Sequence, residues 1–211
     1  MHVPDGFIAP QVFVPAYGLV IGLALYGFKR FKENLNERSI PYLATLSAYA
    51  FVLSSLSLPL PGGTSVHGMG FAPLSILFGP WIAYLCMCLV LLLQAVLLGH
   101  GGITTYSVNA LAIGFVGSFC AYGVYSLLTK RKYATFLSGF ISTLASALFM
   151  SIVLGIHPYL FTDVDGKALY FPYPLSITIL LLLTSHIPVA FVEGLLTQAI
   201  VSFVRRRGLE G

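Results

Sequence analysis

Long apolar runs separated by short polar stretches dominate the chain. The runs occupy residues 11–30, 40–60, 69–79, 81–98, 105–128, 133–155 and 173–204. Most approach the length of about 20 residues that an α-helix needs to cross a bilayer, whereas 69–79 would extend only about 16 Å and is expected to be a short buried or re-entrant helix. The runs are continuous, unlike the alternating strands of a membrane β-barrel. The pattern predicts an all-α integral membrane protein with a single domain over 1–211 and about seven transmembrane helices, one of them short.

The composition of the chain agrees with this prediction. Of its 211 residues, 57% are hydrophobic and 9% are charged, whereas soluble domains carry about 25% charged residues. The apolar runs leave no room for a soluble domain, and the sequence contains no G-x-x-x-x-G-K-[ST] phosphate loop. We therefore expect a membrane protein that does not hydrolyse ATP itself. Cys86, Cys88 and Cys120 lie within apolar runs and are expected to pack as small core residues.

The positive charges predict an orientation in the membrane. Every lysine and arginine except Lys167 falls on one side if 69–79 and 81–98 run across the membrane and back. Basic loops are retained in the cytoplasm. The amino terminus and the loops 61–68, 99–104 and 156–172 would then face outward, and the carboxy terminus would be cytoplasmic. We expect a multi-pass protein of a cell membrane, and the family resemblance described below implies that this membrane is prokaryotic.

The outward face holds His2, His67, His100 and His157. The first ten residues, MHVPDGFIAP, contain no Lys or Arg and do not look like a cleavable signal peptide, so we expect Met1 to keep a free α-amine. That amine, the amide nitrogen of His2 and the Nδ1 atom of His2 would close a five-membered and a six-membered chelate ring around one ion. With a fourth donor, these nitrogens form the square-planar field that Ni(II) and Cu(II) prefer.

His67 is the best candidate for the fourth donor, because its Gly-rich loop lets the backbone approach closely. Residues that could orient the ligands are Asp5, Ser65, His100 and Asn109. Asp5 either caps the turn that enters the first helix or accepts a hydrogen bond from an imidazole. The sequence leaves open whether His100 or Asn109 supports the site.

Four stretches carry a family resemblance. They are MHVPDGFIAP, PGGTSVHGMGFAPLSILFGPW, LLLQAVLLGHGGITTYSVNALAIGFVG and HIPVAFVEGLLTQAIV. They resemble, in the same order, the nickel/cobalt-specific substrate-capture subunits of energy-coupling-factor (ECF) transporters, the NikM/CbiM family. The resemblance implies a seven-helix subunit that binds metal through the Met1 amine, the backbone and ring nitrogens of His2, and the ring of His67. Pro4, Asp5 and Gly6 resemble the opening of nickel-type members, which favours Ni(II) over Co(II) as the captured substrate.

The resemblance also implies partners. Uptake would require a transmembrane coupling (T) subunit, a cytoplasmic ATPase pair and usually a small additional membrane subunit; no nucleic acid is expected. In the wider transporter group, an alanine pair similar to Ala44 and Ala48 docks the coupling subunit, although small residues at this spacing also serve ordinary helix packing. Glu193 and His186 share one face of the last predicted helix, where the carboxylate is either a hydrogen-bonded structural group or a proton site.

Three other interpretations stay open at this point: Co(II) uptake, an integral-membrane metalloenzyme, and a purely structural bundle, which leaves the amino terminus unexplained. Co(II) uptake by the same architecture is the nearest, although Co(II) deprotonates a backbone amide less readily than Ni(II). Copper would bind such a site at least as well as nickel. An integral-membrane metalloenzyme would need an open coordination position and a general base, and the sequence contains no H-E-x-x-H pair.

Overall fold

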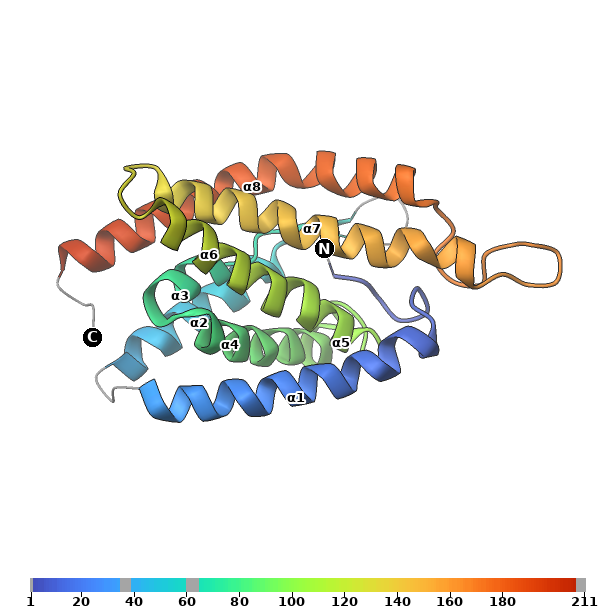
Figure 1. The fold of residues 1–211 in the computed structure, drawn as a ribbon, viewed down its shortest axis with the longest axis horizontal. Coiled ribbons are helices and arrows are strands. Elements are labelled where there is room, and N and C mark those ends of the chain that lie inside the picture. The colour runs from blue at the N-terminus through green and yellow to red at the C-terminus, as the bar shows by residue number, and fades with distance from the viewer. Residues whose placement is uncertain (1, 35–38, 60–64, 208–211) are drawn as a thin grey trace.

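The computed structural model describes residues 2–34, 39–59 and 65–207, which form a helical bundle with one small β-hairpin (Figure 1). The helices are α1 (Pro10–Asn34), α2 (Ile40–Ser55), α3 (Phe71–Phe78), α4 (Pro80–Leu93), α5 (Tyr106–Asn109), α6 (Ser118–Leu128), α7 (Ala134–Leu160) and α8 (Leu175–Arg206). Two π-helical segments, η2 (Gln94–Leu98) and η3 (Ala110–Gly117), extend α4 and join α5 to α6, so the described residues contain seven helical rods. Strand β1 (Ser57–Pro59) pairs antiparallel with β2 (Ser65–His67).

Five rods in the described part of the chain are long and apolar enough to cross a membrane. They are Pro10–Lys32, Pro80–Leu98, Tyr106–Leu128, Ala134–Leu160 and Leu175–Arg206. Helix α2 has 16 residues and α3 has eight, and most of α3 is buried by the surrounding rods, as short helices at membrane depth require. The predicted all-α membrane bundle with one short helix is confirmed.

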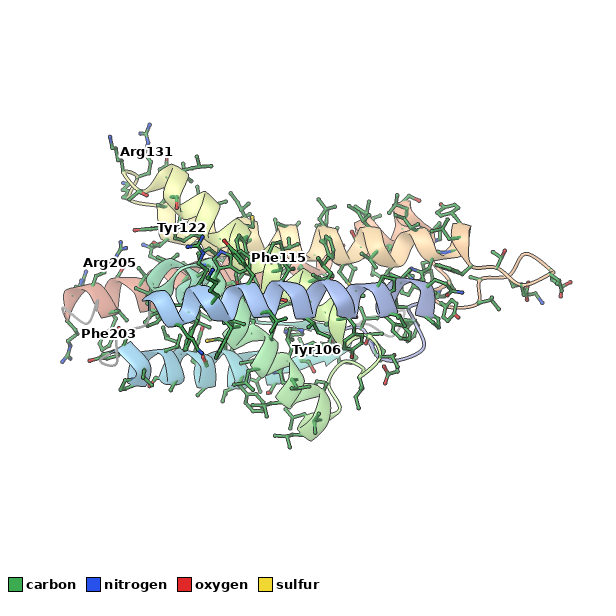
Figure 2. The ribbon with its side chains drawn as sticks, turned by 60° about the horizontal axis from the view of Figure 1, so that its bottom comes forward. Tyr106, Phe115, Tyr122, Arg131, Phe203 and Arg205 are labelled. Carbon is green, nitrogen blue, oxygen red and sulfur yellow. The ribbon has the colours of Figure 1, made fainter. Side chains whose placement is uncertain are left out.

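The rods lie along one long axis, with α1 and α8 at opposite edges (Figure 1). The segment before α1 folds back, so that the amino-terminal end lies over the middle of the molecule in this view. Figure 2 shows Arg131 and Arg205 at one end of the bundle, opposite the end from which the loop after α7 projects. The bundle therefore has one basic end.

Small residues allow α7 and α8 to pack closely. A Cβ atom on Gly139 would lie 2.6 Å from the hydroxyl of Thr197, and one on Gly155 would lie 2.6 Å from the Cα of Leu175. Such distances are too short for any side chain larger than hydrogen, so these positions set how closely the helix backbones approach. The close packing gives α8 a fixed register against the rest of the bundle.

Two predicted segments, 40–60 and 133–155, differ most from the structure in where their helices end. The second apolar run does not remain helical to residue 60, because α2 ends at Ser55 and Ser57–Pro59 forms β1. In a continuing helix, Pro59 would have no N–H to donate to the carbonyl of Ser55 and its ring would clash with that carbonyl, so the helix cannot run through residue 59. Conversely, α7 continues beyond 155 to Leu160, because His157 is buried and hydrogen-bonded and does not interrupt the apolar helix. Residues 61–64 of the predicted 61–68 loop lie outside the described residues.

Candidate metal centre

Three of the four predicted outward histidines meet where the amino-terminal segment folds back. His2 belongs to that segment, His67 ends strand β2 and His100 follows η2. The rings of His2 and His67 stack with centroids 4.2 Å apart and an interplanar angle of 19°, and the His100 ring lies 6.2 Å from that of His2. His2 is 4% exposed and His67 is 2% exposed. The fold thus buries imidazoles from distant parts of the sequence together.

Several ring nitrogens in this cluster have no hydrogen-bond partner among the described residues. They are both ring nitrogens of His2, Nε2 of His67 and Nδ1 of His100. Leaving a buried polar group unsatisfied costs about 1–3 kcal/mol, and native proteins contain few such groups. A cluster of them is therefore a strong indication that the site accommodates a ligand.

The proton positions prepare these rings to act as donors. Nδ1 of His67 lies 2.7 Å from the carbonyl oxygen of Gly68. A carbonyl only accepts, so Nδ1 carries the hydrogen and Nε2 keeps a free lone pair. Burial, and to a smaller extent nearby positive charge, lowers the pKa of both His2 and His67 well below the ordinary value. Both rings are therefore neutral at pH 7, the form that binds metal ions.

The backbone directly after His2 is held on several sides. The amide of Val3 donates to Oδ1 of Asn109 at 3.1 Å, and the Asn109 side-chain amide donates to the carbonyl of Val3 at 3.2 Å. The same carbonyl accepts hydrogen bonds from the Thr105 hydroxyl at 2.6 Å and the Gly102 amide at 3.1 Å. Asn109 and the 102–105 loop therefore fix the position from which His2 projects.

Asp5 adds a second attachment to the same loop. Its carboxylate accepts hydrogen bonds from the amide of Ile103 at 3.2 Å, from the amide of Thr104 at 2.8 Å and from the Thr104 hydroxyl. Partial burial would raise the pKa of Asp5, but these donors outweigh it and lower the pKa. The carboxylate thus holds the amino-terminal segment against the loop. In the described residues it bonds neither to the first turn of α1 nor to an imidazole.

Glycines permit this close contact between the segment and the loop. A Cβ atom on Gly102 would overlap the side chain and the backbone nitrogen of Asp5. Gly101 has a φ of 73°, and a Cβ there would lie 3.0 Å from the side-chain amide nitrogen (Nδ2) of Asn109. The last two glycines of the GHGG motif therefore have a steric explanation.

The remaining candidate residues lie in different surroundings. Met1 lies outside the described residues. Ser65 begins strand β2, two residues before His67. His157 accepts a hydrogen bond from the Ala9 amide at 3.1 Å and donates one to the carbonyl of Val153 at 2.6 Å. Both of its ring nitrogens are occupied, so it joins α7 to the start of α1 and is not a candidate ligand.

On α8, the Glu193 carboxylate accepts hydrogen bonds from the amides of Met69 and Gly70, next to His67. His186 donates from Nδ1 to the carbonyl of Leu182 at 2.7 Å, and its buried Nε2 has no described partner.

Side chains alone do not complete a metal site. Among the described residues, no group of three or more His, Cys, Asp or Glu side chains is arranged to hold an ion. The lone pairs of an imidazole lie in the ring plane, so the stacked rings of His2 and His67 do not aim at one point. Binding one ion to both rings requires one of them to turn out of the stack, with backbone or terminal nitrogens supplying the other donors.

Gln94 is a polar residue at this site that the sequence interpretation missed. It is fully buried, and its side-chain oxygen has no hydrogen-bond partner in the described part of the chain. The available signal was its position within the apolar run LLLQAVLL, since polar residues inside membrane helices are rare and often functional.

Known proteins resemble the chain over its whole length. The family model CbiM, described as the cobalt uptake substrate-specific transmembrane region, matches residues 2–210. The fused nickel transport protein NikMN of Rhodobacter capsulatus is 31% identical over 100% of this chain and 63% of its own length. The probable fused nickel transport protein LarMN of Lactiplantibacillus plantarum is 35% identical over 98% of this chain and 65% of its own length. The chain therefore spans slightly less than two thirds of these two relatives.

A cobalt-named relative and a solved structure match as well. The cobalt transport protein CbiM of Chlorobium limicola is 32% identical over 100% of this chain and 83% of its own length. A crystal structure of a truncated transition metal transporter matches with a TM-score of 0.94 and 30% identity, covering 98% of this chain and 99% of that chain. The helical arrangement is therefore that of a solved metal transporter.

Proposed function

We propose that this chain, which belongs to the CbiM family, the cobalt uptake substrate-specific transmembrane region, captures Ni(II) for uptake across the cell membrane. The observation that carries the proposal is the cluster of buried, unpartnered imidazole nitrogens on His2, His67 and His100. In a bundle of apolar helices, such nitrogens are stabilised by an ion that accepts their lone pairs. The ion is the transported substrate.

Four nitrogens would form the site. They are the α-amine of Met1, the backbone nitrogen and Nδ1 of His2, and Nε2 of His67. The hydrogen bond from Nδ1 of His67 to Gly68 supports this choice for His67, since it leaves Nε2 free. Four nitrogens in a plane favour Ni(II) over Co(II), because the planar field and the deprotonated amide suit Ni(II) better. Co(II) is the alternative substrate, and relatives named for either metal are similar to the chain.

The orientation and partners of the subunit are part of the proposal. The basic end of the bundle would face the cytoplasm, and the histidine cluster would then face the outside. A transmembrane coupling subunit, an ATPase pair and a small additional membrane subunit would supply energy for release, because this chain would not hydrolyse ATP itself. Ala44 and Ala48 are exposed on α2, where a coupling helix could approach closely.

Calorimetric titration of Ni(II) into the purified chain, with its native amino terminus and a carboxy-terminal tag, tests the proposal. His67→Ala should remain helical and lose most of its nickel affinity, because a direct donor is gone. His100→Ala should cost no more than about 10- to 100-fold, the range typical of residues that support a ligand. Equal nickel affinity in wild type and His67→Ala would exclude His67 as a donor, and no binding by wild type would refute the function.

A further inference from the structure

The Gln94 side chain is hydrogen-bonded to α2 at one end only. It lies where α4 passes into the π-helical segment η2, a type of distortion that is frequent at functional sites. Its amide nitrogen donates to the Ser54 hydroxyl at 2.6 Å and to the carbonyl of Phe51 at 3.1 Å. Its carbonyl oxygen is buried with no partner in the described residues. One end of the amide is therefore satisfied and the other is not.

Helix α2 determines which end of the amide faces it. The Ser54 hydroxyl donates its only hydrogen to the carbonyl of Ala50 at 2.5 Å, so it can only accept from Gln94. The carbonyl of Phe51 also only accepts. A flipped amide would place the Gln94 oxygen against two acceptors, so the hydrogen-bond network assigns the nitrogen to α2 and the oxygen to the opposite side.

The group on that opposite side is the ring of His2. Burial is the main cause of the lowered pKa of His2, and the Gln94 side chain partly opposes it, which requires the two groups to be close. The contact does not reach hydrogen-bond geometry, because neither His2 ring nitrogen nor the Gln94 oxygen has a partner at hydrogen-bond distance and angle in the described residues. An acceptor without a donor thus lies beside an imidazole whose N–H has no acceptor.

Metal binding would bring these two groups together. A chelate that includes the backbone nitrogen of His2 uses Nδ1, so the proton must sit on Nε2. Metal-bound histidines almost always donate their other N–H to an acceptor. His67 already has the carbonyl of Gly68 for this purpose. His2 must turn out of its stack with His67 to share an ion, and the Gln94 oxygen is an available acceptor for its Nε2–H.

We propose that Gln94 is a positioning residue for His2: its side-chain oxygen accepts the Nε2–H hydrogen bond when the ion binds, which holds His2 in the tautomer whose Nδ1 lone pair faces the metal. The proposal rests on the function proposed above. The hydrogen bonds from Gln94 to α2 keep the acceptor in place before the ion arrives.

Gln94→Leu, which removes the oxygen at similar size, tests the role against Gln198→Leu, the same change at an exposed position of α8. Calorimetry should show nickel affinity about 10- to 100-fold weaker in Gln94→Leu and unchanged in Gln198→Leu. Planar Ni(II) is diamagnetic, so nuclear magnetic resonance can follow the His2 Nε2–H proton directly. That proton should exchange slowly with solvent in wild type and in Gln198→Leu, and rapidly in Gln94→Leu.

Wild-type nickel affinity and slow proton exchange in a folded Gln94→Leu would overturn the proposal. If that variant does not fold, the nickel-bound wild type decides alone: a slowly exchanging Nε2–H on His2 supports the role, and a rapidly exchanging one overturns it. A wild-type chain that binds no nickel would instead refute the proposed function, so the two failures can be told apart.

Discussion

Glu193 connects helix α8 to the loop that carries His67. The side chain is 2% exposed, and its carboxylate accepts hydrogen bonds from the backbone amides of Met69 and Gly70, the latter at 3.1 Å. Gly70 is the N-cap residue of α3, where a negative charge also interacts favourably with the helix dipole. We predict that Glu193 stabilises both the fold and the position of His67.

The expected size of the effect follows from these contacts. Glu193→Ala leaves two buried amides without an acceptor, at about 1–3 kcal/mol each, so about 2–6 kcal/mol of stability should be lost. Glu193→Gln retains an oxygen acceptor. It loses only the difference in stability between a hydrogen bond to a charged carboxylate and one to a neutral amide oxygen, roughly 1 kcal/mol per bond. Since folded proteins are stable by about 5–15 kcal/mol, the alanine variant should be severely weakened and the glutamine variant should remain folded.

Thermal unfolding in detergent, together with nickel titration, measures both consequences. The unfolding temperature should decrease in the order wild type, Glu193→Gln, Glu193→Ala. Nickel affinity should follow the same order, because the His67 loop loses its attachment to α8. Gln198→Ala, at an exposed position of the same helix, serves as the control and should change stability by no more than about 0.5 kcal/mol. A Glu193→Ala protein as stable as this control would show that the two hydrogen bonds contribute nothing.

Three further predictions follow from the site. Gly102→Ala should displace Asp5 and weaken nickel binding, whereas Gly123→Ala, whose Cβ meets open space, should not; calorimetry on both variants checks this. Burial lowers the pKa of the His2 and His67 imidazoles, so protons should compete with Ni(II) for these rings only below about pH 6.5. The fall in nickel affinity that begins at about pH 8 should therefore come from the terminal amine and the backbone amide, and a nickel affinity that does not change with pH would contradict nitrogen ligation. Ala44→Trp combined with Ala48→Trp should impair assembly or uptake while metal capture persists, and normal uptake by the assembled complex would exclude docking there.

The sequence predicted the helices better than the contacts between them. Continuous apolar runs predict membrane helices, so the seven segments were predictable. The end of α2 was missed because the residues up to Pro59 are as apolar as the helix, and hydropathy alone does not show where the helix ends. The meeting of His2 with His67 was anticipated through the amino-terminal chelate and the family resemblance. The hydrogen bonds of Gln94 and His157 were not predicted. Their partners lie about 40 or more residues away in the sequence, and such contacts depend on the rotation and register of the helices, which apolar periodicity specifies only weakly.

The most direct test of the account is the absorption spectrum of the purified chain during titration with Ni(II), with its native amino terminus and a tag after Gly211. One equivalent of nickel should produce the yellow, diamagnetic form of a planar four-nitrogen site, and a chain with an uncleaved tag before Met1 should not produce it, because its residue-1 nitrogen is an amide. An octahedral nickel spectrum, or equally tight binding by the amino-terminally tagged chain with His67 still required, would contradict the terminal-amine chelate.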